Sequence, residues 1–209
     1  YLVMELVQGQ RLDQHCAALH LGVPERLALF ADVLAAVAHA HSHGVIHRDI
    51  KPSNILVDTQ GVVKLLDFGI AKIVLGDGAD GESTDLTREW GRAMTPQYAA
   101  PEQLRGQAVT TATDVFALGV LLYELLAGSL PFGRARPPTL AQAQALADAM
   151  AAPRRPSAVV ADAALRRQLA GDLDTIVLRA LKTEPAERYA TVSAMADDLA
   201  RHRSGHPVL

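Results

Sequence analysis

The sequence lacks the features that tie a protein to a membrane span or a disulfide framework. Cys16 is the single cysteine among 209 residues, so no disulfide can form within the chain and zinc sites built on paired cysteines are excluded. The most apolar stretch, from Val115 to Leu126, is interrupted by Glu124 and is shorter than the roughly 20 apolar residues that a membrane span requires. We therefore expect no membrane contact within this chain.

An excess of charge of either sign is also missing. The 20 lysines and arginines nearly balance the 23 aspartates and glutamates, and the formal net charge is −3. This balance does not indicate a surface that binds nucleic acid through its charge, so we expect no nucleic-acid partner. Hydrophobic residues make up 49% of the chain and charged residues 21%, which is typical of a globular protein and favours one domain or one large lobe.

The opening residues carry no secretion signal, in which basic, apolar and small residues follow in that order. The chain begins with Tyr1 and not with methionine, so we interpret it as a piece of a longer protein. The missing secretion signal and the single cysteine favour a cytoplasmic location. We expect either that the whole protein is cytoplasmic or that this chain is the cytoplasmic part of a protein whose membrane span lies outside it.

The spacing of apolar residues divides the chain into a short β-rich part and a longer helical part. Residues 1–7 predict a strand that leads into a connector at 8–10, and apolar residues at steps of three and four predict a helix over 24–43. Further β-type runs stand at 45–46, 55–57 and 62–66, the last two joined by a hairpin turn at 58–61. Helices are expected downstream at 113–127, 173–181 and 192–202, and on either side of 153–156.

Three short motifs follow one another in a fixed order: HRDIKPSN at 47–54, DFG at 67–69 and APE at 100–102. Asp49 and Asn54 are too far apart for one helical turn, but a loop can fold both onto one phosphate, and Lys51 supplies a positive charge beside them. Asp67 offers a hard oxygen ligand that, with Asn54, is suited to magnesium. A polar surface turn is the alternative for the first motif, but the spacing of the three favours phosphate transfer.

From Met4 to about Pro207 the sequence resembles the C-terminal lobe of a bacterial Ser/Thr protein kinase of the eukaryotic type. The resemblance implies a protein-kinase-like fold, mainly α-helical, with short β-hairpins that carry the catalytic and metal-binding loops. It implies that Asp49 is the base that helps transfer the γ-phosphate of ATP to Ser or Thr hydroxyls of protein substrates, with Mg2+ as cofactor. Lys51, two residues after Asp49, marks the Ser/Thr branch of the family.

The resemblance also divides the chain and places the nucleotide. It implies that the last strand of an N-terminal lobe and the hinge occupy 1–7, the C-terminal lobe 8–205 and the start of a linker 206–209, with a catalytic loop at 47–54 and an activation segment at 67–102. Met4 then takes the gatekeeper position, the backbone of Glu5 and Val7 lies along adenine, and Leu56 closes the floor of the pocket. Arg11 stands where several kinases carry an acidic residue that reaches the ribose.

Further residues take structural or regulatory roles by the same resemblance. Asp114 matches an aspartate that accepts hydrogen bonds from the catalytic-loop backbone, although it could also cap its helix. Glu102 is expected to form a buried ion pair with Arg188. Arg48 is expected to receive a phosphate placed on the activation segment, and the candidate hydroxyls are those of Ser83, Thr84 and Thr87.

Thr95 resembles the threonine that lines the acceptor pocket for the substrate hydroxyl. For this residue and for the three candidate phosphorylation sites, a solvated loop without such a role is the alternative. A second kinase copy is a candidate partner. Three histidines at 39, 41 and 43 have the look of a metal cluster, but residues two apart on a helix point to different faces, so we do not expect metal there.

The sequence departs from the family where ATP binding begins. The chain has no glycine-rich phosphate loop before the hinge and no V-A-x-K lysine, and Lys64 lies on the wrong strand to replace it. The G-x-G-x-x-G pattern at 76–81 follows the DFG motif and carries two carboxylates, so it is no phosphate cradle. We therefore expect the chain alone to be inactive. The alternative to a catalytic lobe is a pseudokinase or docking lobe that acts as an interaction module.

Overall fold

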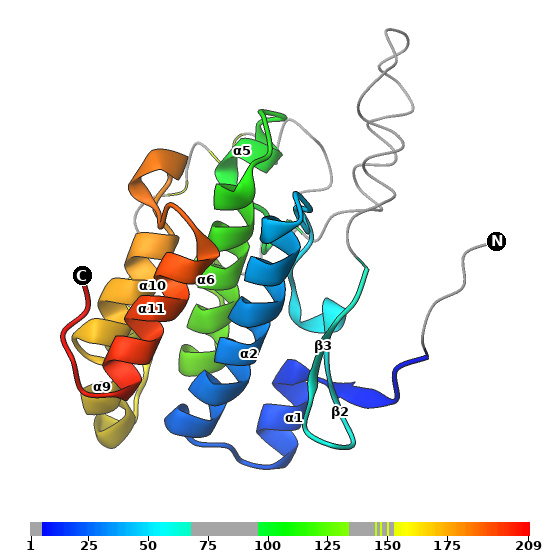
Figure 1. Cartoon of the computed structure of the whole chain (residues 1–209). Coiled ribbons are helices and arrows are strands. Elements are labelled where there is room, and N and C mark those ends of the chain that lie inside the picture. The colour runs from blue at the N-terminus through cyan, green and yellow to red at the C-terminus, as the bar shows by residue number, and fades with distance from the viewer. Residues whose placement is uncertain (1–5, 68–95, 134–144, 146, 148–149, 151–152) are drawn as a thin grey trace, which may run out of the picture.

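The structure is a computed structural model that describes residues 6–67, 96–133, 145, 147, 150 and 153–209. Within these residues the long helices form most of the molecule, and one small antiparallel sheet lies to one side of them (Figure 1). The mainly helical architecture with a short β-hairpin that the sequence predicts is confirmed. Among the described residues, no helix is both long and apolar enough to cross a membrane.

The sheet has the order β1-β2-β3, with β1 at Gly9–Arg11, β2 at Ile55–Asp58 and β3 at Val63–Leu65. The predicted hairpin between β2 and β3 is confirmed. Asp58 Oδ1 stabilises its turn by accepting hydrogen bonds from the backbone N–H groups of Gln60 and Val62, at 2.8 and 2.9 Å.

The predictions of a connector at 8–10 and of a strand at 45–46 are wrong. Residues 1–5 lie outside the described residues, and the first strand is formed by Gly9–Arg11, where a connector was predicted. Gly9 can pair there because any Cβ at this position would lie 2.5 Å from the Val57 carbonyl oxygen. Residues 45–46 form no strand, because the Val45 N–H bonds to the Ala40 carbonyl at 3.0 Å and closes the preceding helix.

Two long helices position the loops that follow or precede them. Helix α2, Val23–Ser42, corresponds to the predicted helix over 24–43. The chain turns away from it at Gly44, whose φ of +74° suits a residue without Cβ. Helix α6, Thr111–Ala127, is capped by Thr110, whose hydroxyl accepts from the Ala112 N–H at 3.3 Å. The alternative of Asp114 as the cap of this helix is therefore wrong.

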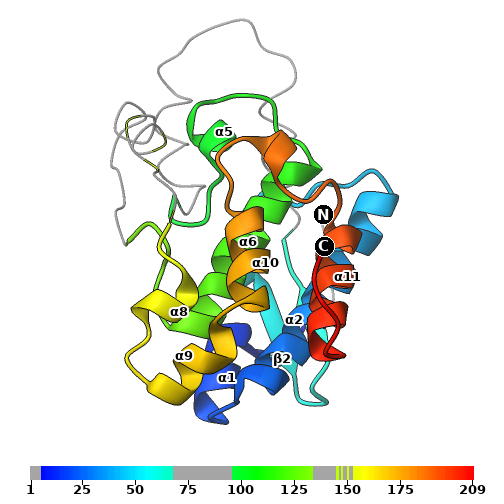
Figure 2. The ribbon, with the colours of Figure 1, turned by 90° about the vertical axis from the view of Figure 1, so that its left-hand side faces the viewer.

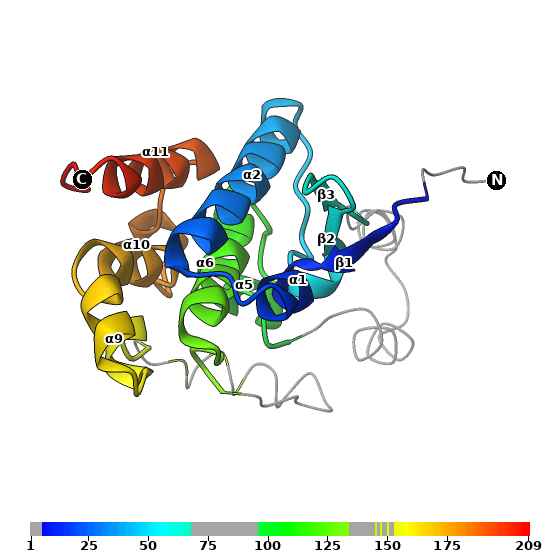
Figure 3. The ribbon, with the colours of Figure 1, turned by 90° about the horizontal axis from the view of Figure 1, so that it is seen from below.

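Helix α6 lies in the middle of the hydrophobic core and is buried over nearly its whole length. Helix α10, Asp172–Ala180, packs so closely on it that a Cβ at Gly119 would lie 2.8 Å from the Cβ of Ala180. Helix α11, Val192–Arg203, packs on α2. Figure 3 shows the sheet on one side of α2 and α6, and α10 and α11 on the other.

The shorter elements complete the lobe. Helices α8 and α9 pack against α10, as Figure 2 shows, and account for the helices predicted after 153–156. Sequence reasoning missed α1 beside the sheet and the single turn α5 before α6. The bounds of the shorter elements are Leu12–Ala18 for α1, Pro52–Asn54 for η1, Pro101–Leu104 for α5, Pro156–Val159 for α8, Ala163–Leu169 for α9 and Pro185–Glu187 for η2.

Candidate active site

The predicted catalytic motif forms the loop between α2 and β2, and it folds its three polar side chains together. The short 3-10 helix η1 turns the chain so that the amide nitrogen Nδ2 of Asn54 donates to the Asp49 backbone carbonyl at 2.9 Å and to Asp49 Oδ2 at 3.2 Å. Lys51 Nζ lies 2.8 Å from the same Oδ2. An amide and an ammonium group therefore hold the Asp49 carboxylate in one orientation at a partly open surface.

Asp67 lies beside this loop because β3 pairs with β2. The backbone N–H of Leu66 donates to the Asn54 carbonyl at 2.8 Å. Asp67 therefore directly follows a residue that is hydrogen-bonded to Asn54. The side chain of Asp67 is exposed, and its φ of +48° turns the chain away from the strand. Because Nδ2 of Asn54 is the donor to Asp49, the amide oxygen is left as the acceptor end. An amide oxygen and a carboxylate fit Mg2+, which prefers hard oxygen ligands.

Asp114, at the start of α6, anchors the catalytic loop to the core. Its buried carboxylate accepts hydrogen bonds from the backbone N–H groups of His47 and Arg48, each at 2.8 Å, and contacts His41 Nε2 at 2.7 Å. Arg48 has a φ of +69°, a left-handed conformation that costs a non-glycine residue about 1–3 kcal/mol. Hydrogen bonds to a buried charge contribute about 1.5–3 kcal/mol each, enough to offset that strain.

His47 connects the HRDIKPSN motif to the residue before the DFG motif. Its ring is fully buried, and Nε2 lies 2.9 Å from the Leu66 carbonyl, which can only accept, so Nε2 carries the hydrogen. The other ring nitrogen, Nδ1, then accepts from the backbone N–H of Asp49 at 3.3 Å. Burial lowers the pKa of His47 despite the nearby Asp114 carboxylate, which favours this neutral form. The backbone of Asp49 is thereby linked to the residue before Asp67.

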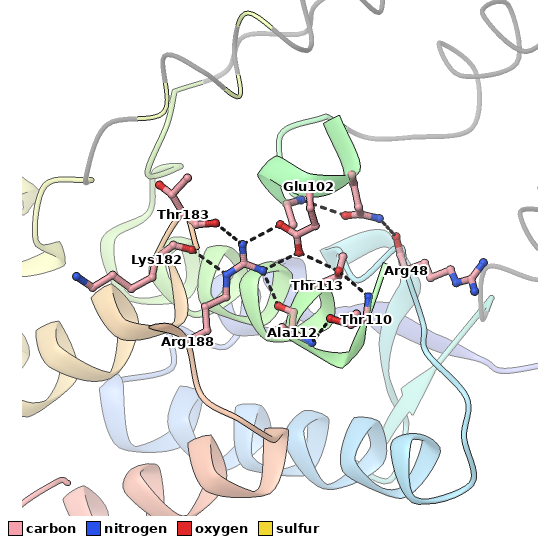
Figure 4. A network of polar contacts seen from close by, with 10 residues as sticks. Arg48, Glu102, Thr110, Ala112, Thr113, Lys182, Thr183 and Arg188 are labelled. Carbon is pink, nitrogen blue, oxygen red and sulfur yellow. Dashed lines mark hydrogen bonds and ion pairs between the residues drawn. The ribbon is translucent and has the colours of Figure 1, made fainter. Parts of the chain in front are cut away.

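A buried ion pair joins the APE motif to the end of the lobe (Figure 4). Both guanidinium ends of Arg188 contact the Glu102 carboxylate, with Nη1 at 2.7 Å from Oε1 and Nη2 at 2.8 Å from Oε2. The Thr113 hydroxyl donates to Glu102 Oε1 at 2.9 Å. Burial alone would raise the pKa of Glu102, but the bonds and the charge of Arg188 outweigh it and lower the pKa below its ordinary value.

Comparison with known proteins identifies the family. Residues 1–200 match the family described as the protein kinase domain. The chain belongs to this family. The membership predicted from the three motifs is therefore confirmed, and so is the protein-kinase-like fold.

Among relatives of this kinase domain are bacterial proteins named serine/threonine-protein kinase PknB. The one from Mycobacterium tuberculosis strain H37Rv is 36% identical over 208 residues, which are 99% of this chain and 31% of that protein. The probable PknB of Corynebacterium glutamicum is 37% identical over 202 residues, 96% of this chain and 30% of that protein. The probable PknB of Lactococcus lactis is 34% identical over 205 residues, which are 98% of this chain and 30% of that protein. The chain thus spans less than a third of the length of these relatives.

The nucleotide side of the kinase domain is described only in part. Glu5 lies outside the described residues, while Val7 and Leu56 are both half-buried, the first before β1 and the second on β2. Arg11 pairs with Leu56 across the sheet and binds Asp13, with Nη2 2.8 Å from Oδ2. A ribose contact from this position would therefore come from an arginine whose charge is already paired.

The predicted phosphorylation and acceptor sites are not among the residues that the structure describes. Ser83, Thr84, Thr87 and Thr95 all fall within 68–95. Their proposed partner is described: the Nε of Arg48 is buried and has no hydrogen-bond partner within the part of the chain that the structure describes.

Sequence reasoning missed a cleft beside Lys51. It has a volume of about 330 Å³ and brings residues of β1, α1 and α6 together with Gln97 and Tyr98. On its wall the Tyr98 hydroxyl donates to Glu124 Oε2, and burial together with this carboxylate raises the pKa of Tyr98. No signal in the sequence joins these positions, because they are 26 residues apart. The cleft is lined by Arg11, Asp13, Lys51, Pro52, Ser53, Gln97, Tyr98, Glu124 and Leu130.

Proposed function

We propose that this chain is the C-terminal lobe of a protein Ser/Thr kinase that transfers the γ-phosphate of ATP to protein hydroxyls. In this proposal residues 1–7 supply the last strand of the N-terminal lobe and the hinge, 8–205 the C-terminal lobe and 206–209 the start of a linker. The single observation that supports it best is the Asp49 carboxylate, held by Lys51 at 2.8 Å and by Asn54 at 3.2 Å at a partly open surface. The names of the relatives favour the Ser/Thr class.

The residues divide the work of an in-line transfer. Asp49 accepts the proton of the attacking hydroxyl while the oxygen of that hydroxyl bonds to the γ-phosphorus. The bond between the γ-phosphorus and the oxygen that bridges it to the β-phosphate breaks, and ADP leaves with that oxygen. Lys51 balances negative charge on the moving phosphoryl group. Asn54 and Asp67 would hold Mg2+, which when bound neutralises the phosphate charge. Glu5, Val7 and Leu56 would contact adenine, and Thr95 would line the acceptor pocket.

Arg48 supports a proposal for activation. Its buried Nε can donate to an anion, and a phosphate on Ser83, Thr84 or Thr87 would supply one through a charge-assisted hydrogen bond. We propose that phosphate transfer takes place in the cytoplasm and that a second kinase copy is a regulatory partner. We also expect the 209 residues alone to be inactive, since they contain no V-A-x-K lysine.

The test is Asp49→Asn in a polypeptide that carries this chain behind its ATP-binding lobe. Because the variant keeps the shape but loses the base, transfer of labelled phosphate from ATP to Ser- and Thr-containing peptides should fall by about 100-fold or more. The matched control is Asp32→Asn, an exposed aspartate on α2, which should transfer like the parent. Turnover of Asp49→Asn close to that of the parent would remove the catalytic assignment. A parent that binds partners but never transfers phosphate would favour the docking lobe.

A further inference from the structure

Gln103, in the single turn α5, bridges two segments that meet at the candidate active site. The side chain is buried, and its Nε2 donates to the backbone carbonyl of Arg48 at 2.9 Å. Its Oε1 accepts from the backbone N–H of Ala100 at 3.0 Å. Arg48 directly precedes Asp49, and Ala100 lies at the end of the predicted activation segment. The amide of Gln103 therefore joins the catalytic loop to the end of the predicted activation segment.

The chemistry of the two contacts specifies the bridging group. The Arg48 carbonyl can only accept a hydrogen bond and the Ala100 N–H can only donate one, so the group between them must do both. A neutral primary amide does so in one orientation, whereas an ionised carboxylate has no hydrogen to give to the Arg48 carbonyl. An aliphatic side chain would leave both buried backbone groups without their side-chain partner.

The bridge acts on the residue whose backbone orients Asp49. Arg48 has a φ of +69°, and its N–H is held by Asp114 Oδ1 at 2.8 Å. Gln103 holds the carbonyl on the other side of the same Cα, so the peptide units before and after Arg48 are both fixed. Asp49, Tyr98 and Gln103 also line one small cavity of about 10 Å³ between the loop and the activation segment. It has room for about one water molecule.

We propose that Gln103 is a positioning residue for phosphate transfer, which keeps Asp49 in register with the segment that presents the substrate hydroxyl. The proposal rests on the proposed function. It predicts that Gln103 affects the transfer step and leaves the affinity for ATP unchanged, because its hydrogen bonds go to Arg48 and Ala100 and not to the residues proposed to contact adenine.

The experiment compares Gln103→Glu, Gln103→Ala and the control Gln107→Ala in the polypeptide that includes the ATP-binding lobe. Gln107 is an exposed glutamine just after α5. At neutral pH we expect kcat of Gln103→Glu and Gln103→Ala to fall by about 10-fold or more, with KM for ATP unchanged and with Gln107→Ala like the parent. As pH falls, the ratio of kcat for Gln103→Glu to that of the parent should rise, because a protonated carboxyl can again donate to the Arg48 carbonyl. The ratio for Gln103→Ala should stay flat.

A second readout does not depend on activity. Hydrogen exchange at the Ala100 amide should speed up in Gln103→Ala, which lacks the acceptor, and stay slow in Gln103→Glu, which retains it. The positioning role is overturned if Gln103→Glu keeps the kcat of the parent, if its pH ratio is flat, or if the Ala100 amide exchanges at the parent rate in Gln103→Ala. A parent that transfers no phosphate refutes the proposed function, and the exchange data then still decide whether the bridge exists.

Discussion

Removing Arg188 should destabilise the lobe more than any change at its surface. The side chain makes five hydrogen bonds: two to Glu102 and one each to the carbonyls of Lys182, Thr183 and Ala112. In Arg188→Ala the Glu102 carboxylate stays buried and retains the Thr113 hydroxyl as its side-chain donor. Breaking a buried pair from one side costs about 3–5 kcal/mol, and for a domain of this size that lowers Tm by about 6–20 °C.

The pH dependence of this loss follows from Glu102. Its pKa in the folded protein is lowered, so its ion pair contributes stability that is full above the ordinary carboxyl pKa and is lost as pH falls through the lowered pKa. The difference in the free energy of unfolding between parent and Arg188→Ala should therefore be largest at neutral pH and shrink in acid. Urea unfolding followed by circular dichroism at several pH values measures it.

Two comparisons sharpen this test. Arg201→Ala, on an exposed part of α11, removes a charge of the same kind and should leave the unfolding curve in place. The double variant Glu102→Met/Arg188→Met should recover part of the loss, because no unpaired charge stays buried. A melting curve of Arg188→Ala that overlays that of the parent would refute the reasoning.

Two more predictions follow from the packing of α6 and from Arg48. Gly119→Ala should lower the free energy of unfolding by about 1–3 kcal/mol, because the new methyl would lie 2.8 Å from the Cβ of Ala180; an unchanged urea midpoint would contradict the close contact of α6 and α10. Replacing Ser83, Thr84 and Thr87 together by Ala should prevent activation of the complete kinase, because Arg48 then receives no phosphate; full activity of the purified triple variant, measured by transfer to a peptide, would argue against this role.

Motifs and long amphipathic helices could be predicted from the sequence, because their signals are local. The order of the three motifs leads to the family, and the apolar steps between 24 and 43 predict α2 to within one residue at each end. The β-hairpin could also be predicted, since Asp58 and Gly61 carry the turn signal themselves.

The remaining features depend on distant parts of the chain. Strand β1 has weak intrinsic β-propensity and forms because Gly9 allows close pairing with β2. Residues 45–46 have a β-type composition, yet the closing turn of α2 uses the Val45 N–H. The bridge from Gln103 to Arg48 spans 55 positions, and no pattern in the sequence relates a glutamine to a carbonyl so far away.

The anchoring of the catalytic loop on Asp114 has a consequence for how the protein loses function on heating. Many enzymes lose activity below their melting temperature, because a weakly held active-site loop opens before the core does. Here the loop backbone is bonded to a fully buried carboxylate on α6, a helix that is buried over nearly its whole length, so opening the loop requires exposing that carboxylate and disturbing α6. The loop and the core therefore belong to one cooperative unit, and the geometry of the loop should persist until the lobe itself unfolds.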